Sequence, residues 1–139
     1  LTVEDVKISQ PQISDSNLNI KMLSPITLHK TNDSGQSIFI SPHDTDFSTE
    51  LNNNFIRKYY SFTGEEPITD VLITPTNVTP NNKYVTCYKK AINSNEKDIY
   101  ITGYRGEYNL VGDPDYLNFL YYCGLGARNS DGFGMFQII

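Results

Sequence analysis

The chain has 139 residues, which is enough for one compact domain and too few for several. Hydrophobic residues make up 38% of it and aromatic residues 12%, and this composition excludes an intrinsically disordered chain. The net charge of −5 argues against a uniformly basic nucleic-acid-binding protein, and two cysteines, Cys87 and Cys123, are too few for a disulfide scaffold. No apolar run approaches the roughly 20 residues that cross a bilayer, so we expect a soluble, cytoplasmic protein.

An alternating pattern opens the part of the chain that has recognisable elements. It predicts a strand over residues 17–30, in which Pro25 marks a bend or an edge position. Turn residues at positions 32–35 predict that residues 26–40 form a hairpin. The alternating apolar residues at the start of the strand are Leu18, Ile20 and Met22.

The period changes to that of an amphipathic helix from Asp44 or Thr45 to Phe62. Either Asp44 or Thr45 can cap the first free N–H groups, and Gly64 can end the helix in a left-handed conformation. The apolar stripe consists of Phe47, Leu51, Phe55, Tyr59 and Phe62.

Three β runs follow, over residues 71–78, 84–92 and 99–111, and turn sequences separate them. They predict a meander. Gly103 and Gly106 interrupt the last run, which indicates a bulge or the close approach of another backbone.

A second helix is predicted to begin at the sequence Asp113-Pro114-Asp115, which supplies a capping carboxylate, a proline at the first helical position and an acid for the helix dipole. Gly124 ends this helix, and residues 133–139 read as a terminal strand. Its expected buried residues are Leu117, Leu120 and Tyr121.

Collapsing the hairpins gives the order β-α-β-β-α-β. This order predicts the α+β class and a ferredoxin-like antiparallel sheet, with two helices on one face and an inserted β-hairpin. We expect this domain to cover residues 17–139 and residues 1–16 to be a leader or an inter-domain linker.

The charges are unevenly distributed along the chain. Residues 1–82 carry five basic and ten acidic side chains, whereas residues 83–139 carry six of each. Any electropositive surface must therefore draw on the second part, although a solvated charged hairpin explains its cations equally well. The cations that cluster there are Lys83, Lys89, Lys90, Lys97 and Arg105.

Residues 124–134 form a glycine-rich loop between the second helix and the terminal strand. Glycines let a backbone turn tightly and let its N–H groups approach an anion. The order helix, loop, strand does not fit a dinucleotide fingerprint or a P-loop, in which a strand precedes the loop. The usual phosphate-binding motifs therefore do not account for this loop.

The ending Gly-Leu-Gly-x5-Gly-Phe-Gly-Met resembles the C-terminal glycine-rich loop of the RAMP proteins, specifically the Cas6 CRISPR RNA endoribonucleases. The segments at residues 24–26, 57–59 and 103–112 are similar to that family's C-terminal half in the same order, so the resemblance covers about residues 17–139. It implies an RNA-binding domain, with phosphates near the loop and with support from the basic part of the chain. The candidate RNA-binding residues are Gly124, Gly126, Arg128, Asn129, Ser130, Gly132, Gly134, Lys89, Lys90 and Arg105.

The resemblance also implies a metal-independent endoribonuclease that cuts precursor CRISPR RNA within repeats, through attack of a ribose 2′-hydroxyl on the adjacent phosphate. Because the family's catalytic histidine belongs to an N-terminal domain, and neither His29 nor His43 matches its position, we assign no catalytic residue, metal or cofactor to this chain. Arg128, Lys58 or Arg105 could assist electrostatically. The implied partners are CRISPR repeat RNA, the protein's own N-terminal domain and other Cas proteins, without a membrane.

Two alternatives remain open. One is a non-catalytic RAMP subunit that binds CRISPR RNA in an effector complex, and the other is a ferredoxin-like domain that binds a protein or a small ligand, which the acidic net charge favours. The ten tyrosines do not separate these alternatives. Some could stack on unpaired bases, although strand and helix periodicity explains most of them as packing residues.

Overall fold

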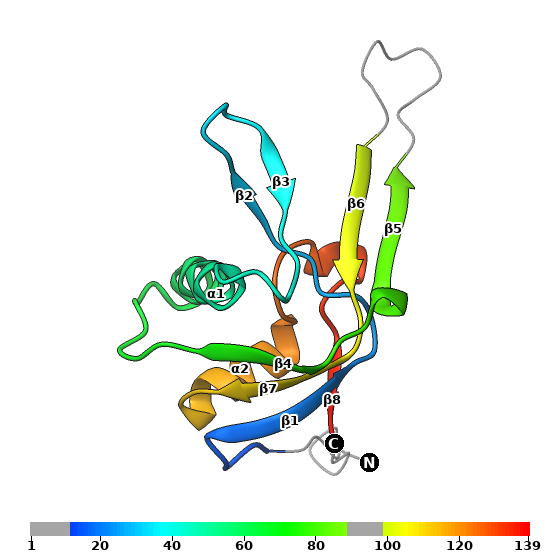
Figure 1. Ribbon diagram of the computed structural model, residues 1–139. Helices are drawn as coiled ribbons and strands as arrows, with labels where there is room; N and C mark the ends of the chain where they lie inside the picture. Colours follow the sequence, from blue (N-terminus) through cyan, green and yellow to red (C-terminus); the bar gives the residue numbers. More distant parts are fainter. Residues whose placement is uncertain (1–11, 89–98) are drawn as a thin grey trace, which may run out of the picture.

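The structure is a computed structural model that describes residues 12–88 and 99–139, and Figure 1 shows how its elements are arranged. Short 3-10 turns at Pro80–Asn82 and Asn129–Asp131 join some of these elements. The helices are α1 (Phe47–Thr63) and α2 (Pro114–Cys123). The strands are β1 (Asn17–Met22), β2 (His29–Thr31), β3 (Ser37–Phe39), β4 (Leu72–Asn77), β5 (Lys83–Tyr88), β6 (Ile99–Tyr104), β7 (Glu107–Val111) and β8 (Phe136–Ile138).

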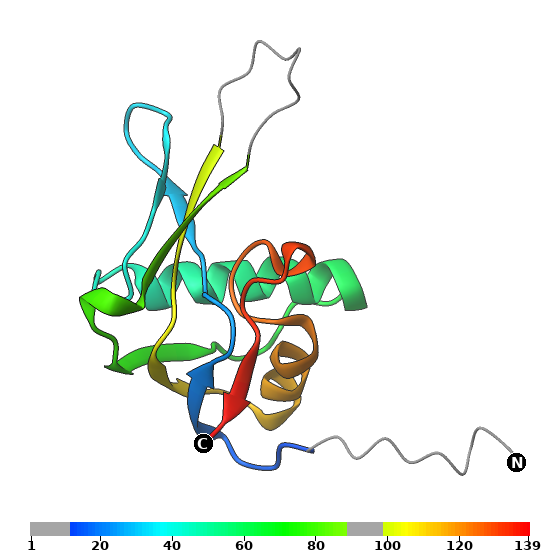
Figure 2. The ribbon, with the colours of Figure 1, turned by 90° about the vertical axis from the view of Figure 1, so that its right-hand side faces the viewer.

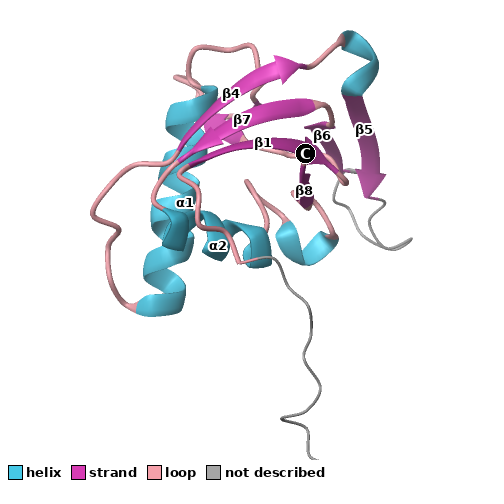
Figure 3. Cartoon of the chain, turned by 90° about the horizontal axis from the view of Figure 1, so that it is seen from below, coloured by secondary structure: helices cyan, strands magenta, loops and turns pink. Residues whose placement is uncertain are grey.

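The main sheet has the strand order β4-β7-β1-β8, and every neighbouring pair is antiparallel. With the two helices included, the chain runs β1-α1-β4-β7-α2-β8, which is the ferredoxin-like topology. Strand β1 is central, because Ile20 lies opposite Tyr108 of β7 on one side and opposite Ile138 of β8 on the other. Figure 3 shows both helices on one face of the sheet, which confirms the predicted fold class.

The core lies between that sheet face and the helices. Burial alternates along β1, as the sequence pattern predicts, and α1 faces the sheet with its apolar stripe. Full burial of one such side chain contributes about 1.5–3 kcal/mol. The stripe thins toward the end of α1, where Tyr59 is half-buried and Phe62 is exposed. The main core residues of these elements are Leu18, Ile20, Met22, Phe47, Leu51, Phe55, Tyr108, Leu110, Leu117 and Leu120.

The first helix ends as predicted but begins later. Gly64 adopts a φ of 74° and closes α1. The residue before the helix is Asp46, which makes no side-chain capping bond, so the predicted cap at Asp44 or Thr45 is wrong. The physical reason is a competing contact, because the Asp44 carboxylate accepts a hydrogen bond of 3.0 Å from the backbone N–H of Ser41.

The second helix begins as predicted. The Asp113 carboxylate accepts a hydrogen bond of 2.9 Å from the N–H of Asp115, and Pro114 occupies the first helical position. The buried residues differ in one place, since Tyr116 is buried and Tyr121 only half-buried.

The predicted meander is wrong. Strand β4 pairs with β7, while β5 and β6 form a separate two-stranded ribbon. The expected strand over residues 99–111 is divided at Gly106, whose φ is +105° and where a Cβ would lie 2.7 Å from the carbonyl oxygen of Asn77. At Gly103 a Cβ would lie 2.7 Å from the Pro25 Cβ and 3.2 Å from the carbonyl oxygen of Ile26, so the predicted close approach of another backbone segment is confirmed at both glycines. The end of the predicted strand, at residues 89–92, lies outside the described residues.

The β2–β3 hairpin forms as predicted, with His29 opposite Phe39. Both ribbons rise from the same end of the sheet (Figures 1 and 2). They meet at their base, where Ile26 and Tyr104 exchange two backbone hydrogen bonds of 2.8 and 2.9 Å. The Thr27 hydroxyl adds a bond of 2.7 Å to the carbonyl oxygen of Thr102 in β6. The chain between β1 and β2 therefore fixes the position of the β5–β6 ribbon.

The packed part of the chain begins before β1. Ile13 is buried in the core, and its backbone N–H and C=O both bond to the side-chain amide of Asn118 in α2, at 2.9 and 2.8 Å.

Candidate nucleic-acid interface

The glycine-rich loop closes onto the chain between β1 and β2. The N–H of Ala127 donates to the carbonyl oxygen of Thr27, and the N–H of Gly134 donates to that of Pro25, each at 2.8 Å. The two ends of the loop also meet, through a bond of 2.9 Å from the N–H of Leu125 to the carbonyl oxygen of Gly134. The loop is therefore held at both ends and in its middle.

Two glycines of the loop are required for this closure. Gly126 has a φ of +71°, and a Cβ there would lie 2.5 Å from the carbonyl oxygen of Thr27. Gly134 has a φ of +86°, and a Cβ there would overlap the carbonyl oxygen of Leu125. Gly132 has a similar φ of +95°, but nothing lies within 4 Å of the place where its Cβ would be. Gly126 and Gly134 therefore exclude a side chain on grounds of space, and Gly132 does not.

Lys58 of α1 anchors the glycine-rich loop through hydrogen bonds. Its Nζ donates three hydrogen bonds: to the carbonyl oxygens of Gly124 and Gly126, at 2.7 and 2.9 Å, and to the side-chain oxygen of Asn129, at 2.9 Å. An ammonium group has three hydrogens, so each one meets one acceptor. Lys58 is thus a structural anchor of the loop, and its charge is not directed toward solvent.

Burial lowers the pKa of Lys58 to about 8, because the ammonium loses part of its hydration. The neighbouring Cys123 acts in the opposite direction on the pKa of Lys58, and burial raises the pKa of the Cys123 thiol itself. The three oxygens around Nζ favour the charged form, so Lys58 carries its proton at neutral pH.

The side chain of Asn129 also belongs to the loop scaffold. Its oxygen accepts from Lys58, and its Nδ2 donates to the carbonyl oxygens of Leu125 and Phe133, at 3.1 and 3.0 Å. These contacts use the acceptor and both donors of the amide. Any RNA contact of Asn129 would therefore have to come from its backbone.

The tip of the loop faces outward. Arg128 and Ser130 are exposed, and Arg128 has the left-handed φ of 59° that is uncommon for a residue other than glycine. The Arg128 guanidinium lies 3.4 Å from one carboxylate oxygen of Asp131. Both partners are more than a third exposed, so this ion pair is weak and leaves the arginine available.

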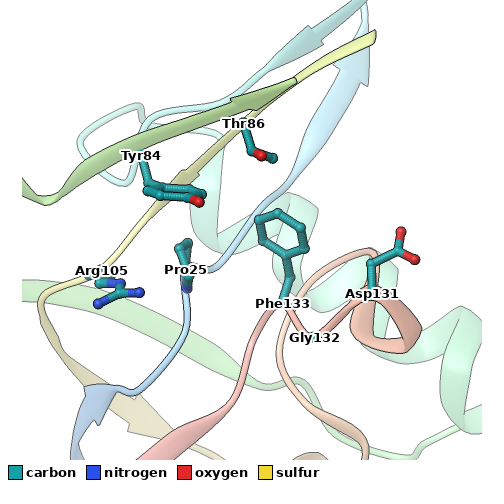
Figure 4. Close-up of a pocket in the computed structure, with 7 residues that line it drawn as sticks. All are labelled: Pro25, Tyr84, Thr86, Arg105, Asp131, Gly132 and Phe133. Carbon is teal, nitrogen blue, oxygen red and sulfur yellow. The ribbon is translucent and has the colours of Figure 1, made fainter. Parts of the chain in front are cut away.

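A cavity of about 200 Å³ separates the loop from the β5–β6 ribbon (Figure 4). Arg105 reaches it from the bend between β6 and β7, and among the described residues this arginine takes part in neither of the two ion pairs, Lys30–Asp46 and Arg128–Asp131. The residues that line the cavity are Pro25, Tyr84, Thr86, Arg105, Asp131, Gly132 and Phe133.

The candidate residues from the sequence divide into three groups. Arg105 and Gly132 line the cavity, and Arg128 and Ser130 are exposed at the loop tip beside it, where Arg128 pairs with the cavity residue Asp131. Gly124, Gly126, Asn129 and Gly134 form the inner part of the loop. Lys89 and Lys90 lie outside the described residues.

Sequence reasoning missed the anchoring role of Lys58 and the contributions of Tyr84 and Phe133 to the cavity. A signal for Lys58 was present, because it lies seven residues after Leu51 and three after Phe55, on the apolar stripe of α1. A cation on a buried face needs oxygen partners inside the protein. No comparable signal marked the cavity, whose walls come from distant segments of the chain.

Other chemistries find little support in the described residues. The His43 ring lies with Nε2 3.0 Å from the carbonyl oxygen of Val78, and the His29 ring packs edge-on against Phe39. Within residues 12–88 and 99–139, no three His, Cys, Asp or Glu side chains come together to hold a metal ion. Neither helix in those ranges has the length and apolarity to cross a membrane.

Comparison with known proteins places this chain among CRISPR-associated proteins. The sequence model of the family described as "CRISPR associated protein Cas6, C-terminal" matches residues 8–138. Two curated relatives come from Methanocaldococcus jannaschii. "CRISPR-associated endoribonuclease Cas6 1" is 29% identical over 119 residues, which are 84% of this chain and 43% of the relative. "CRISPR-associated endoribonuclease Cas6 2" is 28% identical over 135 residues, which are 84% of this chain and 52% of the relative.

Solved structures share the fold. The protein described as "Characterization of a Cas6-related gene from Pyrococcus furiosus" has a TM-score of 0.75 at 23% identity, over 95% of this chain and 51% of its own. The one described as "An RAMP protein binding different RNA substrates" has a TM-score of 0.73 at 23% identity, over 96% of this chain and 52% of its own. The chain therefore spans about half the length of the curated relatives and solved structures that it matches.

Proposed function

Because the chain belongs to the C-terminal domain family of the CRISPR-associated protein Cas6, we propose that it is the RNA-binding part of an endoribonuclease that processes precursor CRISPR RNA within its repeats. The match over residues 8–138 carries this proposal. The curated relatives are named endoribonucleases, which favours this role over that of a non-catalytic RAMP subunit. One of the structural relatives is described as binding different RNA substrates, which supports RNA as the ligand.

The loop and the cavity beside it are the proposed RNA contact. Arg128 and Arg105 are exposed cations whose guanidinium groups suit phosphate oxygens, and the Ser130 hydroxyl can donate to a phosphate. Lys58 does not act in this way, since its three hydrogens are occupied by protein oxygens. Its part is to hold the loop in the shape that presents Arg128.

In the proposed reaction a ribose 2′-hydroxyl attacks the adjacent phosphorus. The 2′-oxygen forms a bond to phosphorus while the bond to the 5′-oxygen breaks, so the products carry a cyclic phosphate and a 5′-hydroxyl. A base removes the proton of the 2′-hydroxyl, and an acid supplies one to the leaving oxygen. No metal or cofactor is required, and the chain positions the phosphates through Arg128 and Arg105.

We place the base and the acid in an N-terminal domain of the same protein. The relatives support this arrangement, because they are about twice as long as the matched region. The proposed partners are that domain, CRISPR repeat RNA and other Cas proteins, and the proposed location is the cytoplasm.

A repeat RNA from the CRISPR array of the genome that encodes the chain tests this function. Binding should be measured by fluorescence anisotropy over a series of salt concentrations, and we expect the affinity to fall with salt because cations contact phosphates. Arg128→Ala should weaken binding and reduce the salt slope by about one. Arg57→Ala, which removes an exposed cation of α1 outside the cavity, is the matched control. RNA binding that is absent at low salt would contradict the proposal.

A further inference from the structure

The cavity beside the loop has the size and walls of a site for a single planar ring. Its volume of about 200 Å³ is below the roughly 300–1,000 Å³ typical of sites for drug-sized ligands. Figure 4 shows the rings of Tyr84 and Phe133 on opposite sides of the opening, with Pro25 below Tyr84. Tyr84 is 45% exposed and Phe133 is 5% exposed, so one ring is accessible from solvent and the other forms a fixed wall. Unpaired RNA bases commonly pack on aromatic side chains in this way.

The charged groups of the cavity lie at its two ends. Figure 4 shows Arg105 beside Pro25, and the carboxylate of Asp131 on the far side of Phe133. One carboxylate oxygen of Asp131 faces Arg128, whereas no described residue donates a hydrogen bond to the other. A nucleotide has its negative charge at one end and its base edge at the other, so the cavity offers a cation for the phosphate and an acceptor for the base.

The acceptor distinguishes among the bases. A carboxylate accepts hydrogen bonds and, when ionised, donates none. Guanine presents two adjacent N–H groups, N1–H and the 2-amino group, on its Watson–Crick edge. Adenine and cytosine present an amino group next to a bare ring nitrogen, and uracil presents one N–H between two carbonyl oxygens, so each sets an acceptor beside the carboxylate.

We infer that this cavity binds one unpaired guanosine nucleotide of the RNA, with the base packed on the Phe133 ring beside Tyr84, its N–H edge on Asp131 and its phosphate on Arg105. This inference rests on the proposed RNA-binding function and adds a base preference to it. The nucleotide is unpaired because its Watson–Crick edge is turned toward the protein.

Short fluorescent oligoribonucleotides of uridine, with and without a single central guanosine, test the preference. We expect the guanosine to strengthen binding about tenfold, which is within the range for one stacked base with hydrogen bonds to its edge. Inosine lacks the 2-amino group and should give an intermediate affinity. Asp131→Asn should abolish the preference for guanosine while the uridine oligonucleotide still binds, and Asp33→Asn, which removes an exposed carboxylate at the β2–β3 turn, should leave the preference intact.

Tyr84→Leu gives a second measurement that does not depend on Asp131. It should weaken the binding of both oligonucleotides, because one wall of the base site is removed. Equal binding of the two oligonucleotides by the unaltered chain, or an unchanged preference in Asp131→Asn, would overturn the guanosine site while leaving RNA binding in place. Failure of both oligonucleotides and of repeat RNA to bind would remove the RNA-binding function and the guanosine site together.

Discussion

Replacement of Lys58 by methionine removes the anchor of the glycine-rich loop and keeps the length of the side chain. Three buried oxygens then lose their donor, on Gly124, Gly126 and Asn129. A buried acceptor without a partner costs about 1–3 kcal/mol, so the three together cost roughly 3–9 kcal/mol. The substitution therefore affects the loop first.

The same substitution also removes an unfavourable contribution to the free energy of folding, namely the cost of burying the Lys58 ammonium. The pKa of Lys58 falls from 10.5 to about 8 on folding, which at about 1.4 kcal/mol per unit is roughly 3 kcal/mol against the buried ammonium. The two effects leave a net loss of about 0–6 kcal/mol. We expect Lys58→Met to lose about 2–4 kcal/mol of stability, near the middle of that range, since the loop can relax toward water. At this chain length such a loss lowers Tm by roughly 8–16 °C.

Thermal unfolding at pH 7, followed by circular dichroism, measures this loss. Lys83→Met is the matched control, because Lys83 is an exposed residue of β5, and its Tm should change by little. Amide hydrogen exchange should also accelerate more at Leu125 and Ala127, within the loop, than at Ile20 in the central strand. A Tm for Lys58→Met equal to or above that of the unaltered chain would show that the three bonds do not hold the loop.

Three further predictions concern the Lys58 proton, the glycines of the loop and the start of α2. Between pH 8 and 10.5 the unfolded chain keeps the Lys58 proton that the folded chain releases, so the free energy of unfolding of the unaltered chain should rise with pH relative to that of Lys58→Met. Urea unfolding at several pH values measures this, and the same pH dependence in both proteins would contradict the prediction. Gly134→Ala should cost more than Gly132→Ala by at least about 2 kcal/mol in the same assay, because only the former brings a Cβ against the Leu125 oxygen. Asp113→Ala should cost about 1 kcal/mol through loss of the α2 cap, and no change in midpoint would show that the cap is dispensable.

Much of the fold could be predicted because local patterns and the sheet agree. The alternation in β1 and the apolar stripe of α1 each identify one buried face, and the β-α-β-β-α-β order leaves few ways to bring those faces together. The pairing of β4 with β7 was not predictable in this way. It depends on the left-handed Gly106 and on the bonds between Ile26 and Tyr104, which redirect the chain into a separate ribbon.

The candidate site was predicted only where a local motif marks it. The glycine spacing located the loop and its exposed Arg128. It carried no information on Tyr84, which lies far away in sequence and reaches the loop through the ribbon. A cavity between distant segments depends on tertiary packing, and no periodicity of either segment encodes it.

The chain between β1 and β2 has a mechanical consequence for the cavity. Pro25 and Thr27 accept hydrogen bonds from the glycine-rich loop, while Ile26, between them, pairs with Tyr104 at the base of the ribbon. The glycine-rich loop and the β5–β6 ribbon, which form the two walls of the cavity, are thus both hydrogen-bonded to the same segment of three residues. These shared bonds restrict any change in the separation of the walls. The cavity is therefore preorganised for its ligand, and the protein loses little conformational entropy when the ligand binds. More of the free energy of the contacts then remains as affinity.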